Sequence, residues 1–142
     1  MVKRKADSEW KGMLKDGEGQ MRLGSGAFEG KYSFHSRFED GKGTNPEELI
    51  AAAHSGCFSM ALAASLEEEG YDPESVKTEA VVDLQKVEGD FEITMIHLKN
   101  RSKILDIEED VFQEIALKAK DNCPVSKALA ATDIELDMEL IS

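Results

Sequence analysis

The sequence is poor in cysteine and in basic residues. Only two cysteines occur among 142 residues, Cys57 and Cys123. The 17 Lys and Arg residues are outnumbered by 29 Asp and Glu residues, which gives a net charge of −12. A charge of this sign repels phosphate backbones and anionic lipid headgroups. The composition therefore argues against a protein that binds nucleic acid or a membrane surface.

Long apolar runs are also missing. The most apolar run covers residues 49–65 and contains His54, Ser55 and Ser59, so it is too short and too polar for the ~20 residues that span a bilayer. The start, MVKRKADSEW, has a basic cluster, but acidic residues and Trp10 follow it in place of the apolar segment of a secretory signal. We therefore expect a cytoplasmic protein, in which a structural disulfide would be uncommon.

The length predicts one domain, residues 1–142, because folded domains most often have roughly 100 to 150 residues. Three patterned pieces near the N-terminus, EWKGML, GQMRLGSG and FEGKYSFHSRF, are separated by turns at Asp16-Gly17 and Gly24-Ser25-Gly26. Each piece is interpreted as a strand of an antiparallel sheet. In the third piece, alternation from Tyr32 to Phe38 predicts a strand that continues to Phe38.

A long helix is predicted from Asn45 to Gly70. Thr44 or Asn45 would be its N-cap, Pro46 suits its first turn and Gly70 suits its C-terminal stop. Alanines occupy positions where a surface helix would carry charges, so the helix should be enclosed. Two chains packed together can enclose such a helix more easily than one small domain can. We therefore predict a homodimer.

The remaining sequence predicts two strands, a helix and a last strand. VKTEAVVDLQKVEG and DFEITMIHLKNRSKI alternate on either side of a turn at Glu88-Gly89-Asp90. IEEDVFQEIALKAKDN has helical spacing, NCP interrupts it, and PVSKALAA favours a short new helix before the alternating DIELDMELI. The order is βββα-ββαβ, and strands grouped in this way indicate an α+β fold.

The two cysteines have different local environments. The thiolate is the reactive form, and an ordinary cysteine with a pKa of about 8.5 is mostly protonated at neutral pH. Cys57 lies about three turns into its helix, where the helix dipole gives little help, so a cation would have to come from elsewhere. Cys123 lies beside a helix N-terminus, which favours a negative sulfur. Local physics makes Cys123 the more acidic thiol, although either cysteine could also be a small buried apolar residue.

Two cysteine-containing segments, RFEDGKGTNPEELIAAAHSGCFSMAL and NCPVSKAL, resemble the signature segments of the OsmC/Ohr family of organic hydroperoxide peroxidases, the first on the OsmC-like branch. The predicted element order resembles that family over essentially the whole chain. The resemblance implies an intertwined homodimer whose long central helices are enclosed by antiparallel sheets. It also implies a two-cysteine peroxidase that reduces alkyl or lipid hydroperoxides to alcohols in oxidative or osmotic stress defence.

The resemblance assigns roles to four residues. Cys57 would be the peroxidatic cysteine that becomes a sulfenic acid, and Cys123 would resolve it as a Cys57–Cys123 disulfide. Arg37 would stabilise the thiolate and the peroxide, and Glu47 would orient Arg37. No bound metal or cofactor is implied, and a dithiol of the lipoyl type or a lipoylated protein would reduce the disulfide. A non-catalytic ligand-binding or redox-sensing module of the same fold is the alternative.

Helical geometry bears on these roles. Glu47, Ile50, His54 and Cys57 follow one another at spacings of three, four and three, which places them on one stripe and Glu48 on the opposite side. Glu47 and Cys57 are ten residues apart, a rise of roughly 15 Å, so they cannot comfortably share one arginine within a chain. We therefore hypothesise that the Glu47 serving one Cys57 comes from the partner chain.

The remaining candidates belong to the surroundings of Cys57. Ile50, His54, Phe58 and Met60 are expected to line an apolar substrate pocket, although the same residues would also suit an ordinary core. His54 lies next to Cys57 on the helix and could act as a general base, but a histidine of the core or pocket wall is the favoured interpretation. The cysteines and histidines show none of the short ligand spacings of zinc sites, so no metal site is predicted.

Overall fold

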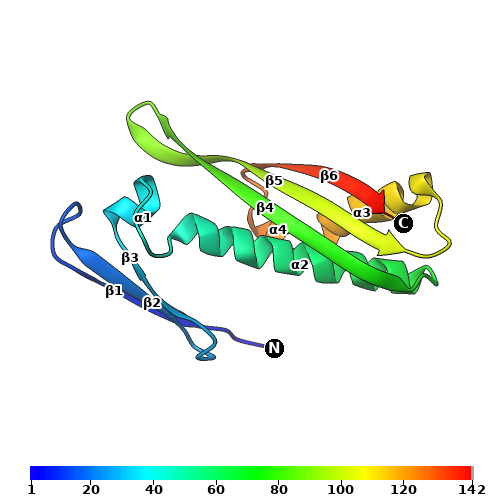
Figure 1. Cartoon of the computed structure of the whole chain (residues 1–142), viewed down its shortest axis with the longest axis horizontal. Helices are drawn as coiled ribbons and strands as arrows, with labels where there is room; N and C mark the ends of the chain where they lie inside the picture. The colour runs from blue at the N-terminus through cyan, green and yellow to red at the C-terminus, as the bar shows by residue number, and fades with distance from the viewer. Residues whose placement is uncertain (142) are drawn as a thin grey trace. The chain divides into compact units, whose positions relative to one another are not determined.

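A computed structural model describes residues 1–141 of the chain (Figure 1). The chain divides into two compact units, the first Met1–Leu49 and the second from Ile50 onward, and each is described by itself. The predicted single domain stays a prediction. Both units combine helices with a sheet, so the fold is mixed α+β with two sheets, as predicted.

The first unit contains an antiparallel sheet in the order β1-β2-β3 (Ala6–Lys11, Glu18–Leu23 and Glu29–Tyr32). Gly19 of β2 lies opposite both Trp10 and Tyr32, and a Cβ at this position would come within 2.6 Å of both rings. The absence of a side chain lets the two rings approach to 5.4 Å between centroids. An aromatic cluster forms on this face of the sheet as a result.

The strand predicted to reach Phe38 ends at Tyr32, and the next residues form the short helix α1 (Phe34–Phe38). The cause is a capping box: the Ser33 hydroxyl accepts the N–H of Ser36 at 3.1 Å, and the Ser36 hydroxyl accepts the N–H of Ser33 at 2.8 Å. Phe34 and Phe38, which suggested a strand by their alternation, are also four apart and pack their rings at 5.0 Å. The prediction of a strand here was wrong.

The long helix α2 (Pro46–Glu68) has the predicted ends. Asn45 caps it by accepting the N–H of Glu48 at 2.7 Å. Gly70 has φ +88°, and the N–H of Tyr71 reaches back to the carbonyl of Leu66 at 2.9 Å, which ends the helix. By length and composition alone α2 could cross a membrane, a property that it shares with the core helices of soluble proteins.

The second unit contains a sheet in the order β4-β5-β6. Strands β4 (Pro73–Val87) and β5 (Asp90–Ile104) form the predicted hairpin, whose turn has positive φ at Glu88 and Gly89. Strand β6 (Asp133–Ile141) pairs with β5 in parallel, so this sheet is mixed and the prediction of antiparallel sheets was wrong here. The reason is that α3 (Glu109–Asn122) and α4 (Pro124–Ala128) form a crossover that returns the chain before β6 begins.

The core of the second unit lies on one face of this sheet. Alternate residues of β5 from Ile96 to Ile104 are buried, which places them on the same face. The helices α2 and α3 supply the other side of the core (Figure 1). The buried apolar cluster comprises Phe58, Leu62, Leu66, Ile96, Leu98, Ile104, Phe112, Ile115, Ala116, Ala119 and Cys123.

Candidate functional site

The second unit brings the two cysteines together. Cys57 lies on α2 and Cys123 lies between α3 and α4, and their sulfur atoms are 2.9 Å apart. Both cysteines are free, since a disulfide would place the sulfur atoms about 2.05 Å apart. Cys123 is fully buried and Cys57 is partly buried. The chain thus holds two reduced thiols in direct contact.

The NCP sequence fixes Cys123 at this position. A residue before proline avoids the helical region, and Cys123 has φ −64° and ψ 118°, so α3 ends here. Pro124 has no N–H and a fixed φ, which suits the first position of α4. The N–H of Cys123 still bonds the carbonyl of Ala119, and its carbonyl accepts the N–H of Lys127. Cys123 therefore closes one helix and opens the next.

The surroundings shift the pKa values of the two thiols in opposite directions. Burial raises the pKa of Cys57, and so does its hydrogen bond with Cys123, against a smaller opposing effect of the Val125 N–H. Burial also acts to raise the pKa of Cys123, but hydrogen bonds from Cys57, from the N–H and hydroxyl of Ser126 and from the Val125 N–H outweigh it, so the pKa falls below its usual value. Within the chain Cys123 is the more acidic thiol.

A buried histidine extends this arrangement. His54 is fully buried on α2, and its Nε2 lies 2.7 Å from the hydroxyl oxygen of Ser126 on α4. Its Nδ1 has no hydrogen-bond partner among residues 1–141. Burial lowers the pKa of His54, so its ring is neutral around pH 7. His54 and Ser126 are 72 residues apart, and no spacing in the sequence indicates that they meet.

The first unit contains the Arg37–Glu47 pair. The Arg37 Nη2 donates to Glu47 Oε1 at 2.8 Å, and Nε lies 3.1 and 3.3 Å from the two carboxylate oxygens. Glu47 is buried and Arg37 is partly exposed, which makes this a two-pronged, charge-assisted contact. The carboxylate of the neighbouring Glu48 instead accepts a hydrogen bond from the hydroxyl of Thr44, the residue before the helix cap, at 2.7 Å.

Arg37 also borders an apolar cavity of about 170 Å³ within the first unit. This cavity was not predicted from the sequence, because the alternation of Phe34 and Phe38 indicated a strand. Their spacing of four residues was the signal that could have indicated a helix face. The lining residues are Trp10, Leu14, Tyr32, Ser33, Phe34, Arg37 and Phe38.

The residues expected to line a substrate pocket on α2 lie in different environments. Ile50 is partly buried and packs against the core, Phe58 is fully buried in it, and Met60 is 77% exposed. Their role as pocket walls stays a prediction. Among residues 1–141, no group of three His, Cys, Asp or Glu side chains is placed to hold a metal ion.

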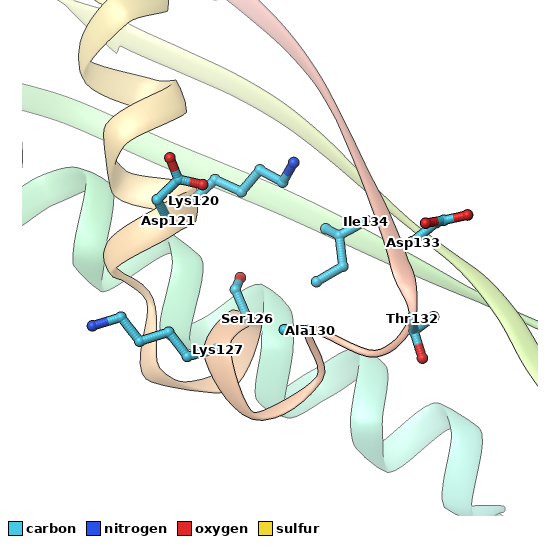
Figure 2. A pocket seen from close by; sticks show the side chains of 8 residues that line it. All are labelled: Lys120, Asp121, Ser126, Lys127, Ala130, Thr132, Asp133 and Ile134. Atoms are coloured by element: carbon cyan, nitrogen blue, oxygen red, sulfur yellow. The ribbon is translucent and has the colours of Figure 1, made fainter.

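A second cavity, of about 390 Å³, lies beside α4 (Figure 2). The Ser126 hydroxyl points toward its interior, between the end of α3 and the start of β6. The Ser126 side chain therefore contacts the buried histidine and also borders this cavity. The lining residues are Lys120, Asp121, Ser126, Lys127, Ala130, Thr132, Asp133 and Ile134.

The chain is similar to known proteins over its whole length. It is 46% identical to peroxiredoxin OsmC of Escherichia coli K12 over 142 residues, 99% of each chain. It is 32% identical to the organic hydroperoxide resistance protein OhrB of Bacillus subtilis over 108 residues, 74% of this chain and 76% of OhrB.

Solved structures show the same fold. The crystal structure of OhrB matches with a TM-score of 0.69 and 26% identity, over 96% of this chain and 98% of that one. An OsmC-like protein of unknown function from Vibrio cholerae matches with a TM-score of 0.77 and 17% identity, over 97% and 99%. The family model of the OsmC-like proteins matches residues 39–139. The chain belongs to the OsmC/Ohr family.

Proposed function

We propose that this protein is a cytoplasmic thiol peroxidase that reduces organic hydroperoxides to alcohols. The observation that carries the proposal is the pair of free thiols whose sulfur atoms lie 2.9 Å apart. Relatives named peroxiredoxin and organic hydroperoxide resistance protein support a peroxidase-type function. The cavity beside Arg37 is lined mainly by aromatic side chains, which suits the apolar part of an alkyl or lipid hydroperoxide.

The reaction has two steps on the chain. The Cys57 thiolate attacks the terminal oxygen of the hydroperoxide, and the S–O bond forms as the O–O bond breaks. The alkoxide that leaves takes up a proton from solvent, which balances the proton that the Cys57 thiol released, and becomes the alcohol. Cys123 then attacks the sulfur of the Cys57 sulfenic acid, the S–S bond forms, and water leaves. The contact between the two sulfur atoms favours this second step by proximity. An external dithiol, of the lipoyl type or on a lipoylated protein, reduces the disulfide, and no bound cofactor takes part.

Arg37 is the proposed source of positive charge for the Cys57 thiolate. The groups that shift the Cys57 pKa within the chain are burial, the other thiol and a backbone N–H, none of which is a cation. A guanidinium held by Glu47 can bind a thiolate and a peroxide oxygen with fixed geometry. Because the two side chains are paired within one chain, we expect them to serve the same Cys57 together.

The partner in the complete site is proposed to be a second copy of the chain. One side of α2 is exposed and carries mostly small residues, which suits close packing of a second helix. The copies would then exchange their Arg37–Glu47 pairs, so that each site uses the thiols of one chain and the ion pair of the other. The exposed residues are Ala52, Ala53, Gly56, Met60 and Ala64.

The first test is peroxide consumption with dihydrolipoamide as the reductant. We expect turnover of tert-butyl hydroperoxide to exceed that of hydrogen peroxide, to vanish in Cys57→Ser and to stall as a sulfenic acid in Cys123→Ser. Loss of the attack only in Cys123→Ser would reverse the roles of the two cysteines. Thiols that oxidise without any turnover would favour a redox sensor over an enzyme.

Mixing two inactive variants tests the composite site. Arg37→Ala retains Cys57 and Cys57→Ser retains Arg37, so a mixed dimer contains one intact site only if the two residues come from different chains. After co-refolding we expect about a quarter of the native activity, from statistical mixing of a symmetric dimer. If the mixture is as inactive as its two components, the ion pair and the thiols of one chain belong to the same site, and the composite site is wrong.

A further inference from the structure

A row of contacting side chains connects the thiol pair to the buried histidine. The His54 Nε2 lies 2.7 Å from Ser126 Oγ. Ser126 follows Cys123 by three residues in the first turn of α4, and its side chain acts to lower the pKa of Cys123. The Cys123 sulfur in turn lies 2.9 Å from the Cys57 sulfur. His54 and Cys123 are fully buried and Ser126 is 6% exposed. The row is thus mostly buried, although Cys57 is partly exposed and Ser126 also borders the cavity of Figure 2.

Packing alone does not account for His54. Buried polar atoms nearly always have a hydrogen-bond partner, yet Nδ1 has none among the described residues. An apolar side chain of similar size would fill the same space without an unpaired atom. The neutral ring, favoured by burial, leaves Nε2 free to accept a proton from the Ser126 hydroxyl.

We propose that Ser126 and His54 form a proton relay for Cys123, in which His54 takes the thiol proton through the Ser126 hydroxyl as Cys123 attacks the oxidised Cys57. The inference rests on the proposed peroxidase function, whose second step requires this proton to leave. It also differs from a role of His54 as the base for Cys57, because the imidazole contacts Ser126, which lies one helical turn after the other cysteine.

The step balances in protons and electrons. The Cys123 proton moves to Ser126 Oγ while the Ser126 hydroxyl proton moves to His54 Nε2. The electron pair on the Cys123 sulfur forms the S–S bond, and the S–O bond of the Cys57 sulfenic acid breaks with its electron pair on oxygen. The proton held by His54 then neutralises the departing hydroxide, which leaves as water. The hydroperoxide that oxidised Cys57 is the oxidant, and the two thiols lose two electrons in total.

The cavity beside Ser126 offers the competing route for the proton. Figure 2 shows the Ser126 hydroxyl directed toward the space between Asp121, Lys127 and Ile134. Charged side chains around this space, and water within it, could take up a proton in place of His54. Of the carboxylates that line the cavity, Asp121 is at the end of α3 and Asp133 is at the start of β6. Asp121→Asn is therefore a necessary control for the relay.

The test separates the two chemical steps in a single turnover. One equivalent of tert-butyl hydroperoxide is added, and sulfenic acid and disulfide are quantified by mass spectrometry after rapid quenching. In His54→Gln and Ser126→Ala we expect sulfenic acid to form at the native rate and the disulfide to form about a hundredfold more slowly at pH 7, as for the loss of a general base. Glutamine can still hydrogen-bond Ser126 but cannot hold the proton. Ser126→Thr, which keeps a hydroxyl, should restore the native rate.

The pH profile distinguishes a relay from a structural contact. In the two slow variants the disulfide rate should rise about tenfold per pH unit, because solvent hydroxide replaces the relay. The native protein should show a much flatter profile, as should Asp121→Asn and the histidine control His97→Gln. Native disulfide rates in His54→Gln, or an equal loss in sulfenic acid formation, would overturn the relay. If His54→Gln failed to fold, disulfide formation at the native rate in Ser126→Ala would overturn the relay.

A peroxide-free assay keeps the relay apart from the proposed function. Ellman's reagent forms a mixed disulfide at Cys57, and Cys123 then displaces the second thiolate, which requires the same proton transfer. A slow second phase in His54→Gln and Ser126→Ala supports the relay even if the native protein fails to reduce any hydroperoxide. A second phase at the native rate in both variants rejects it.

Discussion

The environments of a few side chains decide what each can do. Cys123 gains hydrogen bonds that favour its thiolate, while Cys57 gains none from a cation within its own unit. Arg37, by contrast, is a cation that lacks an anion beyond Glu47 among residues 1–141: Glu47 holds its guanidinium, but 38% of the Arg37 side chain is exposed. A charge that is fixed on one side and open on the other is suited to receive an anion.

Arg37→Lys tests the need for the planar fork. Lysine keeps the charge but cannot hold Glu47, a thiolate and a peroxide oxygen together, so we expect the rate of tert-butyl hydroperoxide reduction to fall roughly 10- to 100-fold. The measurement is kcat/KM, with Arg22→Lys as the control because Arg22 pairs with Glu29 in an exposed position of the same unit. A native kcat/KM in Arg37→Lys would mean that charge alone suffices.

The buried His54 should also make stability sensitive to acid. Its folded-state pKa is lowered by burial, so below about pH 6.5 the unfolded chain binds a proton that the folded chain resists. Stability is therefore lost as the pH falls through the unfolded-state value, by at most about 1.4 kcal/mol per pH unit from this group. Urea midpoints at pH 7.5 and 5.5 should differ more in the native protein than in His54→Gln. An equal difference in the two proteins would contradict this.

At the scale of elements, the sequence pattern predicted most helices and strands and the β4–β5 hairpin, but not the parallel pairing of β6 with β5. Asn45, Gly70 and the turn at Glu88-Gly89 have local chemistry that marks an end or a turn, and all three occur as predicted. Alternation in β6 shows that one face is buried, but it contains no information on whether the neighbouring strand is parallel.

The candidate site shows the same limit. The contact between Cys57 and Cys123 and the contact between His54 and Ser126 each join segments more than 60 residues apart, so no local sequence pattern predicts them. The family resemblance indicated the first pair by its motifs. Nothing in the sequence indicated the second.

The capping box of α1 predicts a measurable loss of stability. Ser33→Ala removes the acceptor of the Ser36 N–H and should cost about 1 kcal/mol, read from urea unfolding. Peroxidase activity should fall as well, because α1 positions Arg37. Ser25→Ala is the matched control, since Ser25 accepts the N–H of Ala27 in an exposed turn outside any helix. Equal unfolding midpoints for the two variants would show that the box contributes little.

At the scale of the whole molecule, the exposed side of α2 predicts assembly. A Cβ at Gly56 would meet nothing within 4 Å, so a single chain has room for a larger side chain there. Gly56→Glu should therefore fold but dissociate the proposed dimer, because a second helix packed on this side would meet a buried charge.

Light scattering coupled to size exclusion measures the mass of each variant. The control is Leu117→Glu, which places the same charge on an exposed apolar position of α3. A native protein of about 16 kDa, or a Gly56→Glu variant with the mass of a dimer, would argue against this surface.

The two cysteines lie 66 positions apart in the sequence, which has a consequence for the folding equilibrium. The segment between them includes the β4–β5 hairpin and α3, so a bond between Cys57 and Cys123 would close a loop around most of the second unit. Closing a loop of this length lowers the entropy of the unfolded chain and stabilises the fold by about 4 kcal/mol. The melting temperature would then report the oxidation state, and a cell under peroxide stress would contain a population of this protein that resists unfolding and proteolysis better than the population at rest.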